Sequence, residues 1–129
     1  MKTKIMRLLL FSSILLLFNV AAMGNDKDLP QEIFKHWIDS HEEDTKDVAV
    51  FRPSGYNFPP ARGRSEFEIK QNGEFVLYRI APACGLEKFS GHWKAEGKGK
   101  IIAYFENNEV VSYTINIISC TNDLLKIMK

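Results

Sequence analysis

The residues best suited to binding chemistry stand together in FRPSGYNFPPARGR, residues 51–64. Arg52, Arg62 and Arg64 each carry a guanidinium group that can hold a carboxylate or another anion through two parallel hydrogen bonds. The prolines fix φ and cannot donate to a β-ladder, so the segment is predicted to be a stiff loop. An acidic run, Glu42–Asp44, lies just upstream. We therefore expect ion pairs between the two segments, with capture of an external anionic ligand as the alternative.

Four aromatic residues form a second candidate binding set: Tyr78, Trp93, Tyr104 and Tyr113. They occupy alternate positions of strand-like segments, where aromatic side chains usually belong to the core. In a barrel slightly too large to fill itself, the same side chains would line a pocket, and their hydroxyl and indole groups would orient a ligand. Because the predicted strands are short, we expect this pocket to be small or absent.

The N-terminus indicates the compartment in which this chemistry takes place. Basic residues precede an apolar run over Leu8–Val20, and small residues follow, with suitable cleavage positions after Ala22 or Gly24. This arrangement is typical of a secretory signal peptide, and the run is too short and too uneven for a membrane span. We predict that residues 1–22 are removed and that the protein is exported, either to the periplasm or to the medium.

The mature chain is expected to contain one domain, residues 29–129, preceded by a flexible segment over residues 23–28. Its length allows a modest hydrophobic core. Residues 1–22 hold three basic residues and no acidic ones, so their removal lowers the formal net charge from +1 to −2. This charge lacks the basic footprint of a nucleic-acid-binding domain, so we predict no nucleic-acid partner. We also predict no membrane span in the mature chain.

The two cysteines, Cys84 and Cys120, both lie in the mature chain. An even cysteine count in an exported protein favours a disulfide between them. Closing so long a loop would stabilise the fold by roughly 3–4 kcal/mol if the bond acts by restricting the unfolded chain. Two separate thiols, one of them buried in a strand, are the alternative.

Metal and catalytic chemistry have little support in the sequence. His36 and His41 are five residues apart, which suits neither one helical face nor one strand face, and the cysteine spacing matches no zinc pattern. The serines lack the turn motif that exposes a hydrolase nucleophile. We predict no metal site, no cofactor and no enzymatic activity.

The elements that must position these side chains are mostly strands. In EFEIK, residues 66–70, apolar and charged side chains alternate, and Asn72-Gly73 is the strongest short signal for a two-residue hairpin turn. Such a turn would bring apolar partners together on one face of the hairpin and charged partners together on the other. The cross-strand pairs that it predicts are Phe67–Tyr78, Ile69–Val76 and Glu66–Arg79.

Apolar and polar residues continue to alternate with a period of two as far as the C-terminus. Asn107-Asn108 is expected to turn one strand back on the next as a second hairpin. The strands predicted in this half span residues 89–96, 100–105, 110–119 and 124–129. The inner face expected for the second hairpin carries Ile102, Tyr104, Val111, Tyr113, Ile115 and Ile117.

One helix is expected after Pro30, because Ile33, Phe34 and Trp37 have helical spacing. It is too short to be stable alone and must pack on the strands. Antiparallel strands with one apolar and one polar face must close into a barrel or pack as a sandwich. Short sequential hairpins favour an all-β fold, a small antiparallel up-and-down β-barrel with one short N-terminal helix, and a β-sandwich is the alternative.

This combination resembles the small lipocalin-like (calycin-type) secreted proteins of bacteria. The shared features are a short helix, the early Trp37, a β-meander with Asn-Gly-type turns and a Gly91-His92-Trp93 strand. Lipocalins carry their Gly-x-Trp in the first strand, whereas here it falls in the middle of the chain. The segments WxxSxEED, residues 37–44, and RPxxYxFPPxRGR, residues 52–64, also resemble a bacterial protein family. The resemblance implies a barrel that could hold a ligand.

These features together favour an exported, non-catalytic protein that binds a small ligand, either partly apolar or anionic. The candidate ligand-binding residues are the four aromatics and the three arginines named above. The alternative is a cavity-free structural or protein-interaction module that acts through its loops, as an inhibitor does. The interior distinguishes the two, because an apolar hollow favours the first function and a filled interior favours the second.

Overall fold

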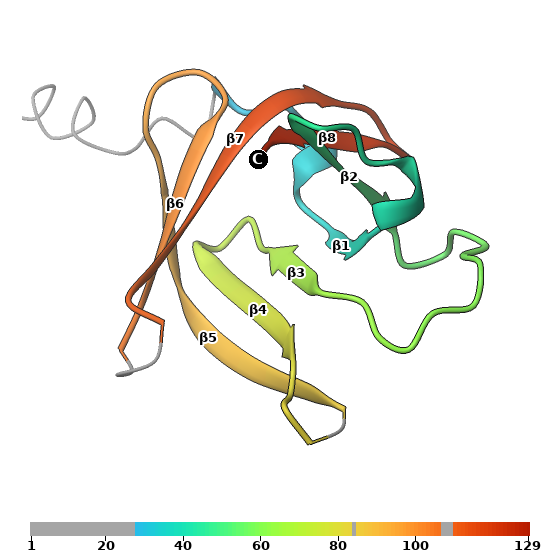
Figure 1. Ribbon diagram of the computed structural model, residues 1–129. Coiled ribbons are helices and arrows are strands. Elements are labelled where there is room, and N and C mark those ends of the chain that lie inside the picture. The colour runs from blue at the N-terminus through green and yellow to red at the C-terminus, as the bar shows by residue number, and fades with distance from the viewer. Residues whose placement is uncertain (1–27, 84, 107–109) are drawn as a thin grey trace, which may run out of the picture.

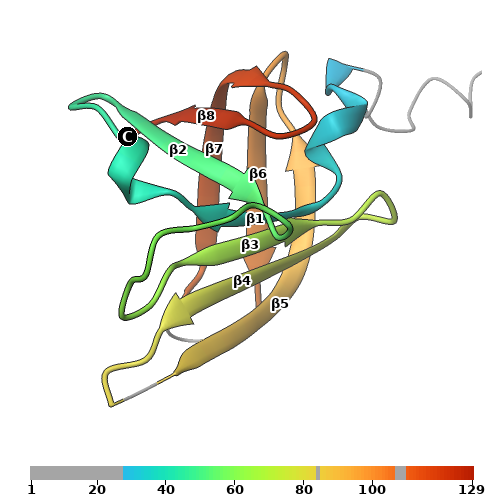
Figure 2. The same cartoon turned by 90° about the vertical axis from the view of Figure 1, so that its right-hand side faces the viewer.

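Within residues 28–83, 85–106 and 110–129, which the computed structural model describes, eight antiparallel strands close into a barrel (Figures 1 and 2). The predicted all-β barrel is therefore confirmed. The predicted signal peptide lies outside these residues. The strands are β1 (His36–Asp39), β2 (Val48–Pro53), β3 (Glu66–Ile69), β4 (Glu74–Ile80), β5 (Leu86–Ala95), β6 (Lys100–Phe105), β7 (Ser112–Cys120) and β8 (Leu125–Met128).

The strand order explains why a long loop follows β2. From β3 to β8 the strands follow one another up and down in sequence order, but β1 lies between β2 and β3, and β2 closes the barrel against β8. Because β1 is antiparallel to both β2 and β3, those two strands run in the same direction. Residues 54–65, which we call the crossover loop, return the chain past β1 and swing out from the side of the barrel (Figure 1).

The predicted N-terminal helix is wrong in length and type. The chain makes a single 3₁₀ turn, η2 (Gln31–Ile33), and a second one, η3 (His41–Glu43), follows β1. A longer helix cannot form because Trp37 already belongs to β1, where its indole Nε1 donates a hydrogen bond to the Ile33 carbonyl at 3.0 Å. None of the helical turns in the described residues is long or apolar enough to cross a membrane.

Side chains from every strand fill the barrel interior. At the centre, the Phe67 ring lies 4.9 Å from Phe51, 5.7 Å from Phe75 and 6.3 Å from Tyr113, measured between ring centroids. The segment around η2 covers one end, where Phe34 packs 5.7 Å from the Trp93 ring. The buried strand residues of this core are Trp37, Phe51, Phe67, Ile69, Phe75, Leu77, Trp93, Ile101, Ala103, Phe105, Ile115, Leu125 and Ile127.

The β3–β4 hairpin differs from its predicted register by one residue. The turn contains three residues, because Lys70 N–H donates to the Glu74 carbonyl and Gly73 N–H donates back to Lys70. Gly73 alone takes a positive φ, of 96°, while the Asn72 side chain accepts a hydrogen bond from Glu74 N–H at 3.0 Å. A two-residue turn of the predicted kind needs two positive φ angles, whereas a three-residue loop needs one. The observed pairs are Glu66–Tyr78, Phe67–Leu77, Glu68–Val76 and Ile69–Phe75.

This shift changes which β4 side chains enter the core. Phe75 and Leu77 are buried with Phe67 and Ile69, whereas the predicted inner residue Tyr78 lies on the outer face. Arg79 does not lie opposite Glu66; it lies opposite Glu87, with 3.8 Å between its Nη2 and the carboxylate.

The predicted face of β6 is also wrong. Ile101, Ala103 and Phe105 face the core, and Tyr104 is 48% exposed on the outer face. The segment KIIAYF is apolar on both faces, so alternation cannot select one. Packing between strands selects the inner face, since Ala103 lies opposite the large Trp93.

On β7 the predicted inner residues Tyr113, Ile115 and Ile117 do pack on the core. Two other residues predicted on the inner face lie elsewhere. Ile102 alternates with the buried β6 residues and so lies on the outer face, and Val111 is 69% exposed. Asn107-Asn108 lies outside the described residues.

Candidate functional site

Two of the three candidate arginines pair with carboxylates of η3: Arg52, at the end of β2, and Arg64, in the crossover loop. Arg52 donates from Nε and Nη2 to the two carboxylate oxygens of Glu43, at 2.8 and 2.7 Å. Arg64 likewise donates to both carboxylate oxygens of Glu42, from Nη1 to Oε2 at 2.9 Å and from Nη2 to Oε1. Each guanidinium also donates to backbone carbonyls, of Asp123 for Arg52 and of Asp39 and Pro59 for Arg64. We call these two pairs the arginine latch, and they confirm the predicted ion pairing.

Aromatic rings complete the latch on the loop side. The Arg52 guanidinium lies 4.8 Å from the centroid of Tyr56, and that of Arg64 lies 4.8 Å from Phe58. The two rings also meet edge to face at 4.9 Å. A planar guanidinium held between a carboxylate and a ring is fixed in both position and orientation. The ends of the crossover loop are therefore anchored to the barrel.

The latch shifts the acidity of both carboxyl groups. The hydrogen bond from Arg52 holds the pKa of Glu43 at about 2, below an ordinary value of 4.5. The hydrogen bond from Arg64 likewise lowers the pKa of Glu42 to about 2. Both carboxylates therefore keep their charge, and with it their ion pairs, well into the acidic pH range.

Replacing Glu43 with glutamine should reduce stability at neutral pH by about 0.2–1 kcal/mol, the range for partly exposed ion pairs. Because the folded-state pKa of Glu43 is depressed to about 2 from 4.5, the stabilisation is complete above about pH 4.5 and is lost as the pH falls through about 2. Urea unfolding of both proteins at about pH 7 and pH 2 measures this difference. Glu106→Gln, at an exposed position, is the control. An equal gap between Glu43→Gln and the unmodified protein at both pH values would contradict an ionic contribution.

Arg62 is arranged differently from the other two arginines. Its side chain is exposed, and among the residues that the structure describes no hydrogen-bond or ion-pair partner is found for it. It lines a pocket of about 350 Å³ on the outside of the barrel, which we call the outer pocket. Arg64, Glu66, Ile80 and Leu86 are also among its lining residues.

The carboxylate that lines the outer pocket already has a partner. Glu66 Oε1 lies 2.8 Å from His36 Nε2, and the His36 ring stacks on Tyr78 with the centroids 5.3 Å apart. Ile80 and Leu86 are 54% and 43% exposed. The outer pocket therefore combines one guanidinium without a partner in the described chain and two exposed aliphatic side chains. Sequence reasoning missed both aliphatic residues, which are the last residue of β4 and the first residue of β5.

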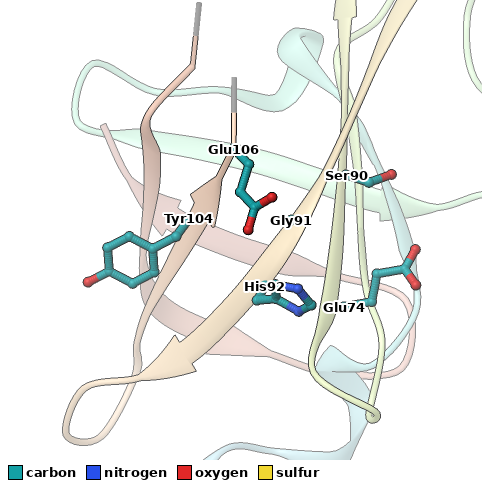
Figure 3. A pocket seen from close by; sticks show the side chains of 6 residues that line it. All are labelled: Glu74, Ser90, Gly91, His92, Tyr104 and Glu106. Atoms are coloured by element: carbon teal, nitrogen blue, oxygen red, sulfur yellow. The ribbon is translucent and has the colours of Figure 1, made fainter. Parts of the chain in front are cut away.

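A second pocket, of about 280 Å³, lies on the outer face of β4, β5 and β6 (Figure 3). Figure 3 shows that Glu106 and His92 lie over β5 and β6, whereas the Tyr104 hydroxyl points away from His92. Within residues 28–83, 85–106 and 110–129, no three or more His, Cys, Asp or Glu side chains are grouped so as to hold a metal ion. Glu74 and His92 of this pocket are directly paired across β4 and β5, and Ser90 and Glu106 also line it.

The four predicted aromatic residues are not brought together. Trp93 and Tyr113 lie inside the barrel and are part of its packing, whereas Tyr78 and Tyr104 lie on the outer face. The Trp93 indole donates to the Lys70 carbonyl at 2.7 Å. Burial raises the pKa of Tyr113, and the negative charge of Asp39 raises it further. These residues do not share one pocket, and their predicted role in ligand binding remains a prediction.

The predicted disulfide is not formed in the structure. Cys120 carries a free thiol, which packs against the core and lies 3.7 Å from the Thr121 carbonyl oxygen. Cys84 lies outside the described residues. Its neighbours in the sequence follow β4 and precede β5, at the end of the barrel away from the β7–β8 turn (Figures 1 and 2).

Cys120 should react slowly with thiol reagents in the folded protein. Burial raises the pKa of its thiol to about 11 from 9.0, so about 100-fold less reactive thiolate is present near pH 8. Peptide mass spectrometry after timed iodoacetamide labelling, without reductant, follows Cys120 separately from Cys84. Labelling in urea is the control and should be fast. Failure to label Cys120 even in urea would show instead that it is bonded.

Comparison of the chain with protein-family models, with curated proteins and with solved structures finds no match. The barrel agrees with the fold that a lipocalin-like protein would have, and the family resemblance itself stays a prediction.

Proposed function

We propose that this protein is an exported, non-catalytic module that binds another protein through the outside of its barrel. The filled interior is the observation that carries the proposal. Every strand contributes a buried side chain to one packed core, and both pockets described above lie on the outer surface. A carrier of small ligands needs a hollow lined by apolar and a few polar groups. The core favours the protein-interaction alternative over a ligand held inside.

The crossover loop supports the same proposal. A loop that is held at both ends loses little conformational entropy when a partner binds, and pre-ordered loops bind more tightly for that reason. The arginine latch anchors both ends of this loop, through Arg64 at one end and through the contact of Arg52 with Tyr56 at the other, and Tyr56 packs on Phe58 within the loop. Export is supported by the pattern of the first 22 residues.

A photo-crosslinking amino acid placed at Leu86, beside the outer pocket, tests the proposal in cells of the protein's own source. Thr114 is the control position, because it is exposed on β7, across the barrel from β3 and β4. We expect a discrete crosslinked protein from position 86 and none from position 114. Native mass spectrometry of the protein purified from that source should give the mass of the chain without a small ligand. A retained small molecule, or equal crosslinking from both positions, would overturn the proposal.

A further inference from the structure

We propose that the outer pocket recognises a partner segment in which an acidic side chain stands next to an aliphatic one. In this arrangement Arg62 holds the carboxylate, and Ile80 and Leu86 contact the aliphatic side chain. The inference rests on the proposed function and names the chemistry of the partner at the same surface.

The charges of the pocket argue for an acidic partner group. Arg64 already donates to Glu42 and to two carbonyls, and Glu66 already contacts His36. Arg62 is the remaining charged residue that lines the pocket, and it is exposed. A guanidinium binds a carboxylate through two hydrogen bonds in a fixed plane, which supplies both attraction and orientation. The complement of this group is one carboxylate.

The apolar part of the pocket is built from two strands. Ile80 and Leu86 are directly paired across β4 and β5, so their side chains lie on the same face of the sheet. The crossover loop closes on them at Gly63, whose Cα hydrogens face the Ile80 side chain, since an added Cβ would lie 3.4 Å from Ile80 Cγ1. Arg62 is the next residue of that loop. The cationic group and the aliphatic surface are therefore adjacent and belong to one site.

The size and shape of the pocket favour a protein segment over a small acid. A volume of about 350 Å³ is near the lower limit of pockets that bind free small molecules, which are usually more enclosed. A small acid would leave much of its surface in water here. A peptide segment can extend beyond the pocket along the exposed part of the crossover loop, where Tyr56 is also exposed. Arginine and aromatic residues often provide most of the affinity in such interfaces.

Selection of a random peptide library displayed on phage, against the purified protein, tests this inference. We expect the enriched peptides to carry Asp or Glu beside Leu, Ile or Val. In fluorescence anisotropy, Arg62→Glu should weaken their binding by about tenfold or more, because attraction becomes repulsion. Arg62→Ala should weaken it less. Lys126→Glu, the same charge change at an exposed position on β8, should alter it by less than about twofold. Circular dichroism checks that each variant is folded.

A second readout locates the binding. The methyl NMR signals of Ile80 and Leu86 should shift when a selected peptide is added, and selection against Arg62→Glu should yield Lys or Arg in place of the acidic residue. Peptides that shift these signals but carry no acidic residue would overturn the inference while leaving the proposed function intact. Absence of any enriched peptide would also overturn it, and the crosslinking experiment would then decide the proposed function separately. Octanoate binding with the affinity of the best peptide would assign the pocket to small acids instead.

Discussion

Replacement of Gly91 by alanine should destabilise the barrel by about 3 kcal/mol or more, at the upper end of overpacking effects. An ideal Cβ at this position would lie 2.1 Å from the Tyr104 carbonyl oxygen and 2.8 Å from Phe105 Cδ1. The first of these atoms is backbone, so no side-chain rotation relieves the contact. Relief requires β5 to move away from β6, which breaks the pairing of Gly91 with Phe105.

Gly55→Ala is the matched control for this substitution. Gly55 lies in the crossover loop, has no positive φ, and a Cβ there would meet no atom within 4 Å. Its stability should change by less than about 0.5 kcal/mol. Urea unfolding followed by tryptophan fluorescence measures both variants against the unmodified protein. Equal unfolding midpoints for Gly91→Ala and Gly55→Ala would mean that β5 and β6 do not approach each other as described.

Phe67→Ala should cost about 3–5 kcal/mol, because it removes a large ring from a filled core and leaves a cavity. Phe67 is 1% exposed and contacts the rings of Phe51, Phe75 and Tyr113. A domain of this size is stable by only about 5–15 kcal/mol, so this one change removes a large share of the total. Phe67→Leu, which fills part of the space, should cost clearly less.

The control for Phe67→Ala is Tyr104→Ala. Tyr104 is 48% exposed on the outer face of β6, so its removal should cost no more than about 0.5 kcal/mol. The predicted inner position of Tyr104 would instead give a loss similar to that of Phe67→Ala. Urea unfolding of the two variants therefore distinguishes the observed face of β6 from the predicted one. The variant Phe67→Ala should also gain affinity for benzene if the new cavity stays open.

Only part of the candidate site could be predicted from local sequence patterns. The three arginines and the acidic run are visible in the sequence, and their opposite charges predicted the latch. The sequence did not show which arginine would have no partner within the described part of the chain. That outcome depends on β1 lying between β2 and β3, because the crossover loop must then pass η3, where Arg52 meets Glu43 and Arg64 meets Glu42. Strand order is a long-range property, and charge spacing along the chain does not encode it.

By itself the sequence determined an antiparallel all-β fold with a stiff arginine loop, because alternation, turn residues and charge act over a few neighbouring positions. It left a barrel and a β-sandwich as alternatives, and the observed pairing of β2 with β8 and of β1 with β3 closes the barrel. Only the tertiary structure decided the registers and the filled interior. Asn72-Gly73 permits a two- or a three-residue turn, and burial of Phe75 and Leu77 beside Phe67 selects the second. KIIAYF has apolar residues on both faces. The small Ala103 faces the core because the large Trp93 lies directly opposite it on β5. In each case side chains distant in sequence compete for one interior volume, and close packing selects a single arrangement.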